Sequence, residues 1–242
     1  MTRLGEPYAE AFTPPGGHAS DSPFYYAFTY GNVRFLSIDS VDTEAHAARY
    51  GYIGDPTSRQ YQWLLRELSA ARRDPRLDWT IVYWHHPPYS ASTGFGGHGS
   101  QLPMRRALSP LMDGYNVLLV YNGHDHDFQR SRPLRGNAVV DENEGTIYYV
   151  TGGGGGRTAF RGTGADWFTA KSEQVFHYLR AKVDHYTMTI EAVNTAGQVF
   201  DTYSVTIPKN QRKPPLLPAE PVPFDDEADP PAETPDVEAT GG

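Results

Sequence analysis

The sequence predicts an α/β fold in which a mixed sheet is layered with helices. The middle of the chain alternates helix-like and strand-like segments, in the order α-β-α-β, and only strand-like segments follow residue 145. The length of 242 residues suits one domain with an appendage. No apolar run approaches the roughly 18 residues that a membrane helix needs.

The first strands form a predicted hairpin. Phe24–Tyr30 and Val33–Asp39 are rich in aromatic and β-branched residues, and Gly31-Asn32 between them is a turn signal. Residues 1–23 are rich in Gly, Pro and Ser, so we expect an irregular lead-in before the hairpin.

Apolar spacing predicts two helices. Thr57 and Gln60 make a capping-box pattern, and apolar residues recur at i, i+3, i+4 and i+7 from Tyr61. The second helix is predicted to begin near Pro103, because proline suits a first helical turn, and Pro110 is expected to kink or end it.

Apolar and β-branched runs predict the remaining strands. Trp79–Trp84 is apolar throughout, as expected of a strand buried on both faces, and a strand at 116–121 follows the second helix. Later strands are expected at Thr146–Thr151, Val175–Val183, Tyr186–Val193 and Val199–Ile207, with a turn at Asn194–Gly197.

The net charge of −8 originates in one segment of the sequence. Pro214–Gly242 holds eight of the 29 acidic residues, eight prolines, one aromatic residue and no Lys or Arg. Such a segment buries too little apolar surface to offset its ordering entropy, so we expect residues 209–242 to be a disordered, Pro-rich acidic tail. The remaining sequence balances its charges, which gives no electrostatic reason to expect nucleic-acid or membrane binding.

The most informative stretch is Gly123–His126, an H-x-H pair that follows a strand-like apolar run. A second pair, His85-His86, follows the strand before it, and His98 lies in a glycine-rich loop between them. Ligands of layered α/β sheets gather where strands end, so we expect these side chains at one site. The chain has no cysteine, and a metal ion held by His, Asp, Glu or Asn would be Fe, Mn, Zn or Mg.

The runs WHHPPYS (84–90), GGHGSQLPMR (96–105) and NGHDHDFQRS (122–131) resemble calcineurin-like metallophosphoesterases of the purple-acid-phosphatase-like branch. The resemblance covers roughly residues 20–207, also through YYAFTYGNVRFLSIDS, QYQWLLREL and TIYYVTGGGGG. It implies that residues 24–208 form the C-terminal portion of a four-layer α/β-β/α sandwich, with mixed sheets flanked by helices. The implied activity is phosphatase or phosphodiesterase hydrolysis of phosphate esters.

The family's site holds two divalent or trivalent metal ions (Fe, Mn or Zn) that stabilise phosphoryl oxygens. Carried onto this sequence, the resemblance implies that His85 and His124 bind one ion and His126 the other. It makes His98 the catalytic candidate, which would orient the phosphate or protonate the leaving group.

Four further residues are expected beside the metal ions. His86 would line the mouth of the site or orient a neighbour, and Arg130 would brace the histidine loop. Asp125 and Asp127 are either partners of the metal-binding histidines or solvated side chains, and the sequence leaves these two possibilities open.

The carboxylate motifs of the family are absent: Asp-x-His or Asp-x-Gly, Gly-Asp with its metal-bridging carboxylate, and Gly-Asn-His. Gly54-Asp55 is followed by Pro56 and lies after the hairpin, in the wrong order, and Asp39 is not at a ligand position. We therefore expect the chain to hold the histidine half of the site and to be inactive alone. The alternative is a non-catalytic, degenerate or truncated module that binds one metal ion at most, or a partner.

Other motifs favour structural roles. Gly152–Gly156 precedes Arg157-Thr158 and fits neither GxxxxGK[ST] nor GxGxxG, so we expect a loop that lets backbones approach closely beside the site. Phe128 occupies the Asp position of the H-x-H-x-D-H motif, which excludes metallo-β-lactamase-like hydrolases. Core roles are expected for Trp63, Trp79, Trp84 and Trp167, and ordinary hydrogen-bonding roles for His18, His46, His177 and His185.

The expected partner is a phosphate ester substrate, without nucleic acid or membrane. The oligomeric state and the compartment stay open. The chain shows no signal peptide or transmembrane segment, whereas members of the family are often exported.

Overall fold

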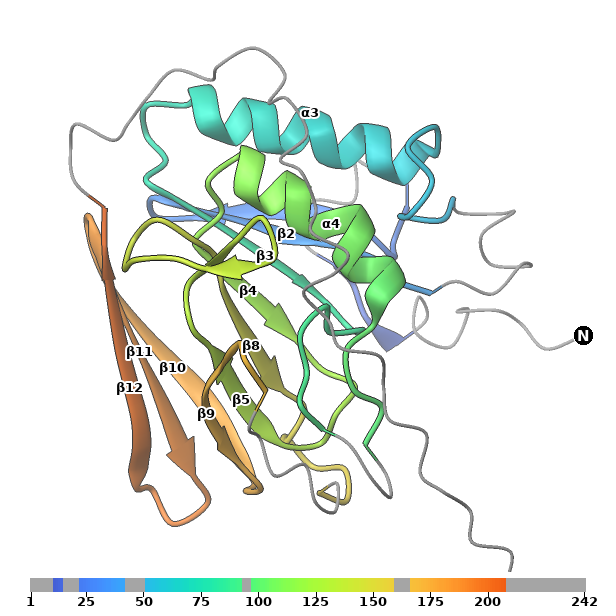
Figure 1. Cartoon of the computed structure of the whole chain (residues 1–242). Helices are drawn as coiled ribbons and strands as arrows, with labels where there is room; N and C mark the ends of the chain where they lie inside the picture. The colour runs from blue at the N-terminus through green and yellow to red at the C-terminus, as the bar shows by residue number, and fades with distance from the viewer. Residues whose placement is uncertain (1–10, 15–21, 42–50, 93–96, 159–165, 208–242) are drawn as a thin grey trace, which may run out of the picture.

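The computed structural model describes residues 11–14, 22–41, 51–92, 97–158 and 166–207. Within these ranges, a seven-stranded mixed sheet is covered by two helices on one face and by a three-stranded antiparallel sheet on the other (Figure 1). Among the described residues, no helix is both long and apolar enough to cross a membrane.

The large sheet has the strand order β1-β2-β3-β4-β8-β5-β9. Strands β2, β3, β4 and β8 are mutually parallel, whereas β1, β5 and β9 run antiparallel to their neighbours. The bounds are Tyr26–Tyr30 (β1), Val33–Ser37 (β2), Trp79–Trp84 (β3), Leu119–Asn122 (β4), Phe128–Ser131 (β5), Ile147–Thr151 (β8) and Thr169–Glu173 (β9).

The second sheet is a meander in the order β10-β11-β12. Its strands are His177–Asp184 (β10), Thr187–Asn194 (β11) and Val199–Thr206 (β12). Two short strands, β6 (Leu134–Arg135) and β7 (Ala138–Val139), pair separately.

Helices α3 (Arg59–Arg73) and α4 (Leu102–Gly114) bury their apolar faces on one side of the large sheet. The helix side chains in this core include Trp63, Leu64, Leu68, Met104, Leu108 and Met112, and the sheet side chains include Leu36, Val82, Val120 and Tyr148. Figure 1 shows α3 and α4 side by side above the strands.

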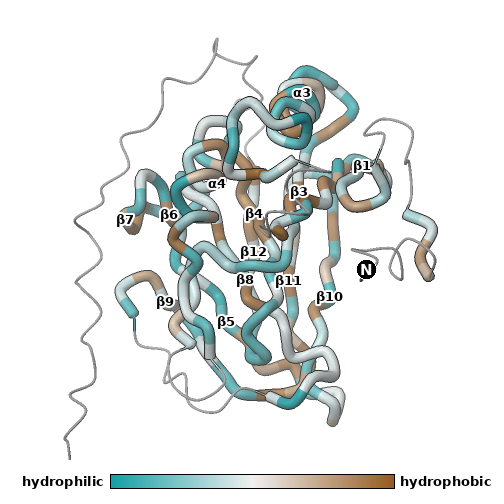
Figure 2. Tube along the Cα trace, turned by 90° about the vertical axis from the view of Figure 1, so that its right-hand side faces the viewer, coloured by the Kyte–Doolittle hydropathy of each residue, from teal (hydrophilic) through white to brown (hydrophobic). Residues whose placement is uncertain are grey.

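The opposite face of the sheet forms a second core, because successive side chains of a strand point to opposite faces. In β3, Val82 belongs to the helix-side core, whereas Ile81 belongs to the second core. Met188, Ile190 and Val205 of the small sheet complete this second core. A quarter turn shows hydrophobic colouring along the central strands β4 and β8 (Figure 2).

The predicted fold class is confirmed, and the described residues supply three of the four expected layers, namely helices, mixed sheet and antiparallel sheet. The hairpin with its Gly31 turn and the buried central strand are also confirmed. The expected lead-in lies largely outside the described residues, and so does the acidic tail.

The capping prediction for the first helix is wrong. Ser58, not Thr57, is the N-cap of α3: its hydroxyl accepts a hydrogen bond from the Tyr61 N–H, at 3.1 Å. Pro110 does not end helix α4, which continues to Gly114 and buries residues on both sides of the proline, whereas a kink at Pro110 stays a prediction. Packing of that face outweighs the loss of one backbone donor.

Candidate metal centre

The histidines lie on two loops that leave neighbouring parallel strands. Parallel pairing sets Trp84, the last residue of β3, opposite Asn122, the last residue of β4. The loops that follow are joined directly, because the Gly123 N–H donates to the His85 carbonyl at 3.0 Å. The Asn122 side chain donates to the Trp84 carbonyl at 3.1 Å. The two chain segments that carry histidines are thereby held together.

Three imidazoles converge in what we call the histidine cluster, formed by His85, His86 and His124. Each offers one nitrogen, and these atoms all lie within 4.8 Å of one another. His124 Nδ1 is 3.0 Å from His85 Nε2, so one of these neutral rings donates to the other. His86 Nδ1 lies 2.9 Å from Ser40 Oγ, which orients the ring and leaves Nε2 for a ligand.

The backbone of His124 is strained, with φ of 71°. A non-glycine residue in this left-handed region costs about 1 kcal/mol or more, and such strain concentrates at functional sites. The preceding glycine, whose carbonyl accepts the Asp125 N–H at 2.9 Å, helps to form this tight turn. The contact between His124 Nδ1 and His85 Nε2 and the Gly123–His85 backbone bond hold the residue in this conformation.

Two rings of the cluster, those of His124 and His85, are held in the uncharged form. Burial, followed by repulsion from His98, His86 and other neighbouring histidines, lowers the pKa of His124 to about 4. Burial and the same kind of repulsion also lower the pKa of His85. Both rings are therefore neutral near pH 7, which is the form of imidazole that binds metal ions.

Asp125 and Asp127 are buried beneath the histidine loop and are not solvated. The Asp125 carboxylate accepts hydrogen bonds from the Ser90 hydroxyl at 2.5 Å and from the His98 backbone N–H at 2.7 Å. The Asp127 carboxylate accepts a hydrogen bond from the Ser92 hydroxyl. These contacts tie the H-x-H loop to the segment after β3, and they engage both carboxylates away from the cluster.

Gln129 extends this polar scaffold. Its amide oxygen accepts from the Ala91 N–H at 2.8 Å, and its amide nitrogen donates to the hydroxyls of Ser92 at 2.7 Å and Ser90 at 3.1 Å. Sequence reasoning missed Gln129, Ser90, Ser92 and Ser40. Ser90 and Gln129 lie inside the histidine-bearing runs, where their polar character was the one available signal, whereas Ser40 and Ser92 lie outside those runs.

His98 and His126 lie next to the cluster in different ways. The ring centroid of His98 is 4.0 Å from that of His124, with the planes tilted by 33°. His126 instead places Nδ1 2.8 Å from the Arg157 carbonyl. His98 can thus reach a ligand held at His124, whereas His126 faces the glycine-rich loop.

The glycine-rich loop makes the predicted close approach. A Cβ on Gly152 would lie 2.1 Å from the Asp125 carbonyl oxygen, and one on Gly156 would lie 2.6 Å from the His126 ring. Only glycine fits at these two positions without movement of the loop that carries the histidines.

Arg130 is placed differently from the expectation that it braces the histidine loop. Its guanidinium pairs with Asp201 of β12, at 2.7 Å and 2.9 Å, and lies over the Tyr203 ring at 4.8 Å from the centroid. Strand β5, which begins four residues after His124, is thereby fixed to the small sheet. Arg130 belongs to strand β5 itself, so its side chain is positioned by the strand and not by the histidine loop.

The histidines and tryptophans that were predicted to have structural roles make structural contacts wherever the structure describes them. His177 contacts Thr151 Oγ1 at 3.0 Å and the Val175 carbonyl at 2.9 Å. The His185 carbonyl accepts from the Trp79 indole at 2.7 Å. His18 and His46 lie outside the described residues. Trp63, Trp79 and Trp84 are core residues, and Trp167 packs against that core.

The donor set of the histidine cluster fits one metal ion. Three neutral imidazole nitrogens suit Zn, Fe and other borderline ions. A second ion beside the first would need a bridging carboxylate, and among the described residues no carboxylate joins the group of potential ligands.

Sequence comparison gives relatives that are consistent with this site. The sequence model of the calcineurin-like phosphoesterases matches residues 3–128. An uncharacterized protein of Mycobacterium tuberculosis is 35% identical over 147 residues, covering 54% of this chain and 27% of that protein. Purple acid phosphatase 15 of Arabidopsis thaliana is 30% identical over 154 residues, covering 63% of this chain and 26% of that protein.

A third relative, probable inactive purple acid phosphatase 27 of Arabidopsis thaliana, is 29% identical over 195 residues, covering 75% of this chain and 30% of that protein. The chain thus spans less than a third of the length of these curated relatives. The solved structure of a purple acid phosphatase from yellow lupin (Lupinus luteus) seeds matches with a TM-score of 0.73 at 22% identity, covering 86% of this chain and 36% of that one. At that identity the structural match establishes the fold.

Proposed function

Because the chain belongs to the calcineurin-like phosphoesterase family, we propose that it serves metal-dependent hydrolysis of phosphate esters. Within a dinuclear site, it would contribute the histidine half. The observation that carries this proposal is the contact between His85 Nε2 and His124 Nδ1, at 3.0 Å, with the His98 ring beside it. In this proposal, residues 24–208 are the C-terminal portion of the hydrolase domain, and the substrate is a phosphate monoester or diester.

The residue roles follow from position. His85 and His124 would hold one ion, with His86 as a third imidazole, and His126 would offer Nε2 to the second. A bound ion would polarise a phosphoryl oxygen as a Lewis acid. His98, whose backbone is fixed by Asp125, would orient the phosphate or protonate the leaving oxygen.

The buried carboxylates would act by position. Asp125 joins the backbone of His98 to the H-x-H loop, so it sets the distance between the proton donor and the metal ligands. Ser40 would orient His86 through its Nδ1 atom. These contacts keep the reacting groups within the narrow tolerance that catalysis demands.

Turnover of an aryl phosphate tests the proposal. His124→Ala should lower metal-dependent kcat/KM about 100-fold or more, a loss typical of a displaced ligand. His185→Asn is the matched control, since His185 lies outside the cluster and asparagine tolerates its φ of 47°. The measurement needs a form of the protein that also contains the family's carboxylate motifs. Turnover that survives His124→Ala would refute the assignment.

A second candidate function is a non-catalytic module that holds one metal ion or a partner. The favouring observation is that Asp125 and Asp127 are engaged by serine hydroxyls, so the cluster offers imidazoles alone among the described residues. A relative named as an inactive purple acid phosphatase is consistent with this alternative. Two metal ions per chain together with turnover would exclude it.

A further inference from the structure

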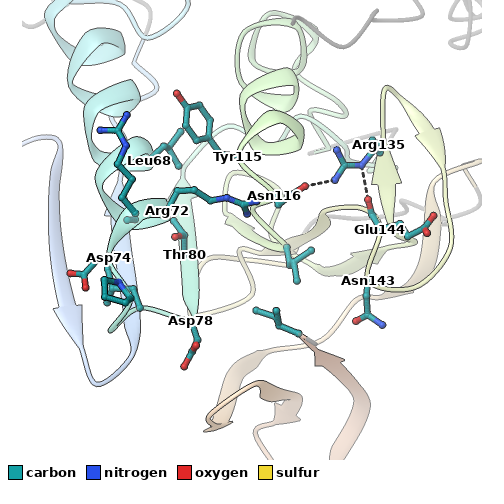
Figure 3. A pocket seen from close by; sticks show the side chains of 16 residues that line it. Leu68, Arg72, Asp74, Asp78, Thr80, Tyr115, Asn116, Arg135, Asn143 and Glu144 are labelled. Atoms are coloured by element: carbon teal, nitrogen blue, oxygen red, sulfur yellow. Dashed lines mark hydrogen bonds between the residues drawn. The ribbon is translucent and has the colours of Figure 1, made fainter. Parts of the chain in front are cut away.

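A cavity of about 670 Å³ lies at the opposite ends of the strands that lead to the histidines. Thr80, near the start of β3, and Leu118, just before β4, line it. The ends of α3 and α4 lie above it (Figure 3), and Ile207, just after β12, also lines it. The volume falls in the range of small-molecule sites, about 300–1,000 Å³.

Arg72 is the unusual group in this cavity. Its half-buried side chain extends from the last turn of α3 toward Asn116 (Figure 3). It forms no hydrogen bond or ion pair with any residue that the structure describes, and burial lowers its pKa. A desolvated guanidinium without partners is costly, so an anion placed there would be stabilised.

Arg135, which also reaches the cavity, is already satisfied. Arg135 donates to the Glu144 carbonyl at 2.6 Å, the Asp113 carbonyl at 2.9 Å and Asn116 Oδ1 at 2.7 Å. Figure 3 shows two of these bonds on the side of the cavity facing Arg72. Among the cations that line the cavity, Arg72 and the exposed Arg73 have unused donors within the described part of the chain, and Arg72 is the half-buried one.

The nearby carboxylates do not neutralise Arg72. Asp74 is held by Arg76 at 2.6 Å, and Asp78 accepts from the Asn32 side chain at 2.6 Å. Glu144 is exposed. The cavity therefore presents one half-buried, unpaired positive charge beside apolar walls, and the exposed Arg73 also lines it.

Further donors lie below that charge. The Asn143 side-chain oxygen accepts from the Thr206 N–H at 3.3 Å, which leaves its amide N–H groups for a ligand. The Thr80 hydroxyl also lines the cavity and has no side-chain partner among the described residues. Leu118 and Ile207 supply apolar surface beside them.

We propose that this cavity binds a small monocarboxylate with an apolar body, its carboxylate on the Arg72 guanidinium and its body against Leu118 and Ile207. The planar fork of arginine matches a carboxylate with two parallel hydrogen bonds. A single charge is favoured over a phosphate dianion, because Arg72 is the one half-buried guanidinium without a partner among the described residues, and both helices point their partially negative carbonyl ends here. This inference is independent of the proposed hydrolytic function.

Benzoate is the probe, and its binding to the intact chain is followed by NMR shifts of backbone amides that line the cavity. We expect saturable binding in the millimolar range, about −4 kcal/mol or weaker, as for other small fragments. Benzamide, which has the same ring and no charge, should bind about tenfold more weakly or not at all. Inorganic phosphate should produce no saturable shift of these amides.

Arg72→Gln should weaken benzoate binding about tenfold, through loss of the charge-assisted pair. Arg66→Gln is the matched control, because it removes the same charge from the same helix at an exposed position that does not line the cavity. Its effect should stay below about twofold. If Arg72→Gln fails to fold, the benzoate and benzamide comparison on the natural chain still decides.

Three results would overturn the proposal. They are an absence of saturable shifts with benzoate, equal binding of benzamide and benzoate, and equal losses in the two arginine variants. Saturable binding of phosphate tighter than that of benzoate would also contradict it, since the cavity would then select charge rather than a carboxylate on an apolar body.

Discussion

At the residue scale, buried acids decide how this molecule responds to pH. Asp113 sits in the last turn of α4, and burial raises the pKa of its carboxyl to about 6. The Gly136 N–H, which donates to Asp113 Oδ2 at 2.8 Å, offsets this only in part. Because the pKa in the folded chain lies above the ordinary value of 3.8, the folded state binds this proton more readily than the unfolded state. Stability is therefore lost as the pH rises through about 6.

Asp113→Asn should remove this cost while keeping an acceptor for Gly136. We expect the free energy of unfolding to rise by about 2 kcal/mol at pH 8 and by much less near pH 4, where the carboxyl is protonated in the folded state. Urea unfolding at both pH values measures the difference. Asp141→Asn, at an exposed position, serves as control and should show neither effect. A gain that is equal at both pH values would contradict the assignment to Asp113 ionisation.

At the scale of elements, the capping-box pattern of helix α3 predicted the helix start correctly to within one residue, because the N-cap is Ser58 and not Thr57. The apolar periodicity predicted the helix, and the capping-box pattern selected Thr57. In the structure the Thr57 hydroxyl and N–H both donate to Asp55 Oδ1 at 2.8 Å, which completes a turn before the helix. Ser58 is therefore the N-cap. Gln60 is buried, where its side-chain oxygen accepts from the Asp39 N–H at 2.7 Å and its amide nitrogen donates to the Asp39 carbonyl at 3.0 Å.

Replacement of the cap tests this arrangement. Ser58→Ala should lower the free energy of unfolding by about 1 kcal/mol, because the Tyr61 N–H loses its acceptor. Thr57→Ala, the matched control one residue earlier, should cost about half as much or less, since the Thr57 N–H keeps its bond to Asp55. Thermal or urea unfolding compares the two variants. A larger loss in Thr57→Ala would restore the original capping-box assignment.

The strands that the sequence did not reveal are the polar ones. Phe128–Ser131 and Thr169–Glu173 lack an apolar run, and they pair with each other at one end of the large sheet. Their strand character comes from tertiary pairing and from the Arg130–Asp201 ion pair, and neither can be read from local pattern. The central strands were predictable, because burial on both faces demands apolar residues throughout.

In the candidate site, too, a residue's position could be predicted only where a sequence motif contained that residue. The H-x-H motif and its strand context pointed to His85 and His124 together. Ser40 and His86 meet at 2.9 Å although 46 residues separate them, and no local pattern signals such a contact. The placement of His126 against the Arg157 carbonyl depends on the path of the glycine-rich loop.

At the scale of the whole molecule, the central parallel strands have two chemically different ends. The carboxyl ends present the imidazoles of the histidine cluster, and the amino ends present the half-buried Arg72 guanidinium, which is unpaired among the described residues. The same strands fill both cores, so the two ends are held on one rigid sheet. The sheet fixes the positions of the two loops that carry the histidines. The chemical properties of the site come from the few polar residues on those loops.

The central claim is that the histidine cluster binds metal with His85, His86 and His124. Titration of the metal-stripped chain with Zn²⁺ under calorimetry tests it most directly, with His124→Ala and His126→Ala side by side. We predict one tightly bound ion per chain, affinity about 100-fold weaker in His124→Ala, and near-natural affinity in His126→Ala, whose ring lies outside the cluster. Two tightly bound ions per chain, or equal binding by His124→Ala and the natural chain, would contradict the claim.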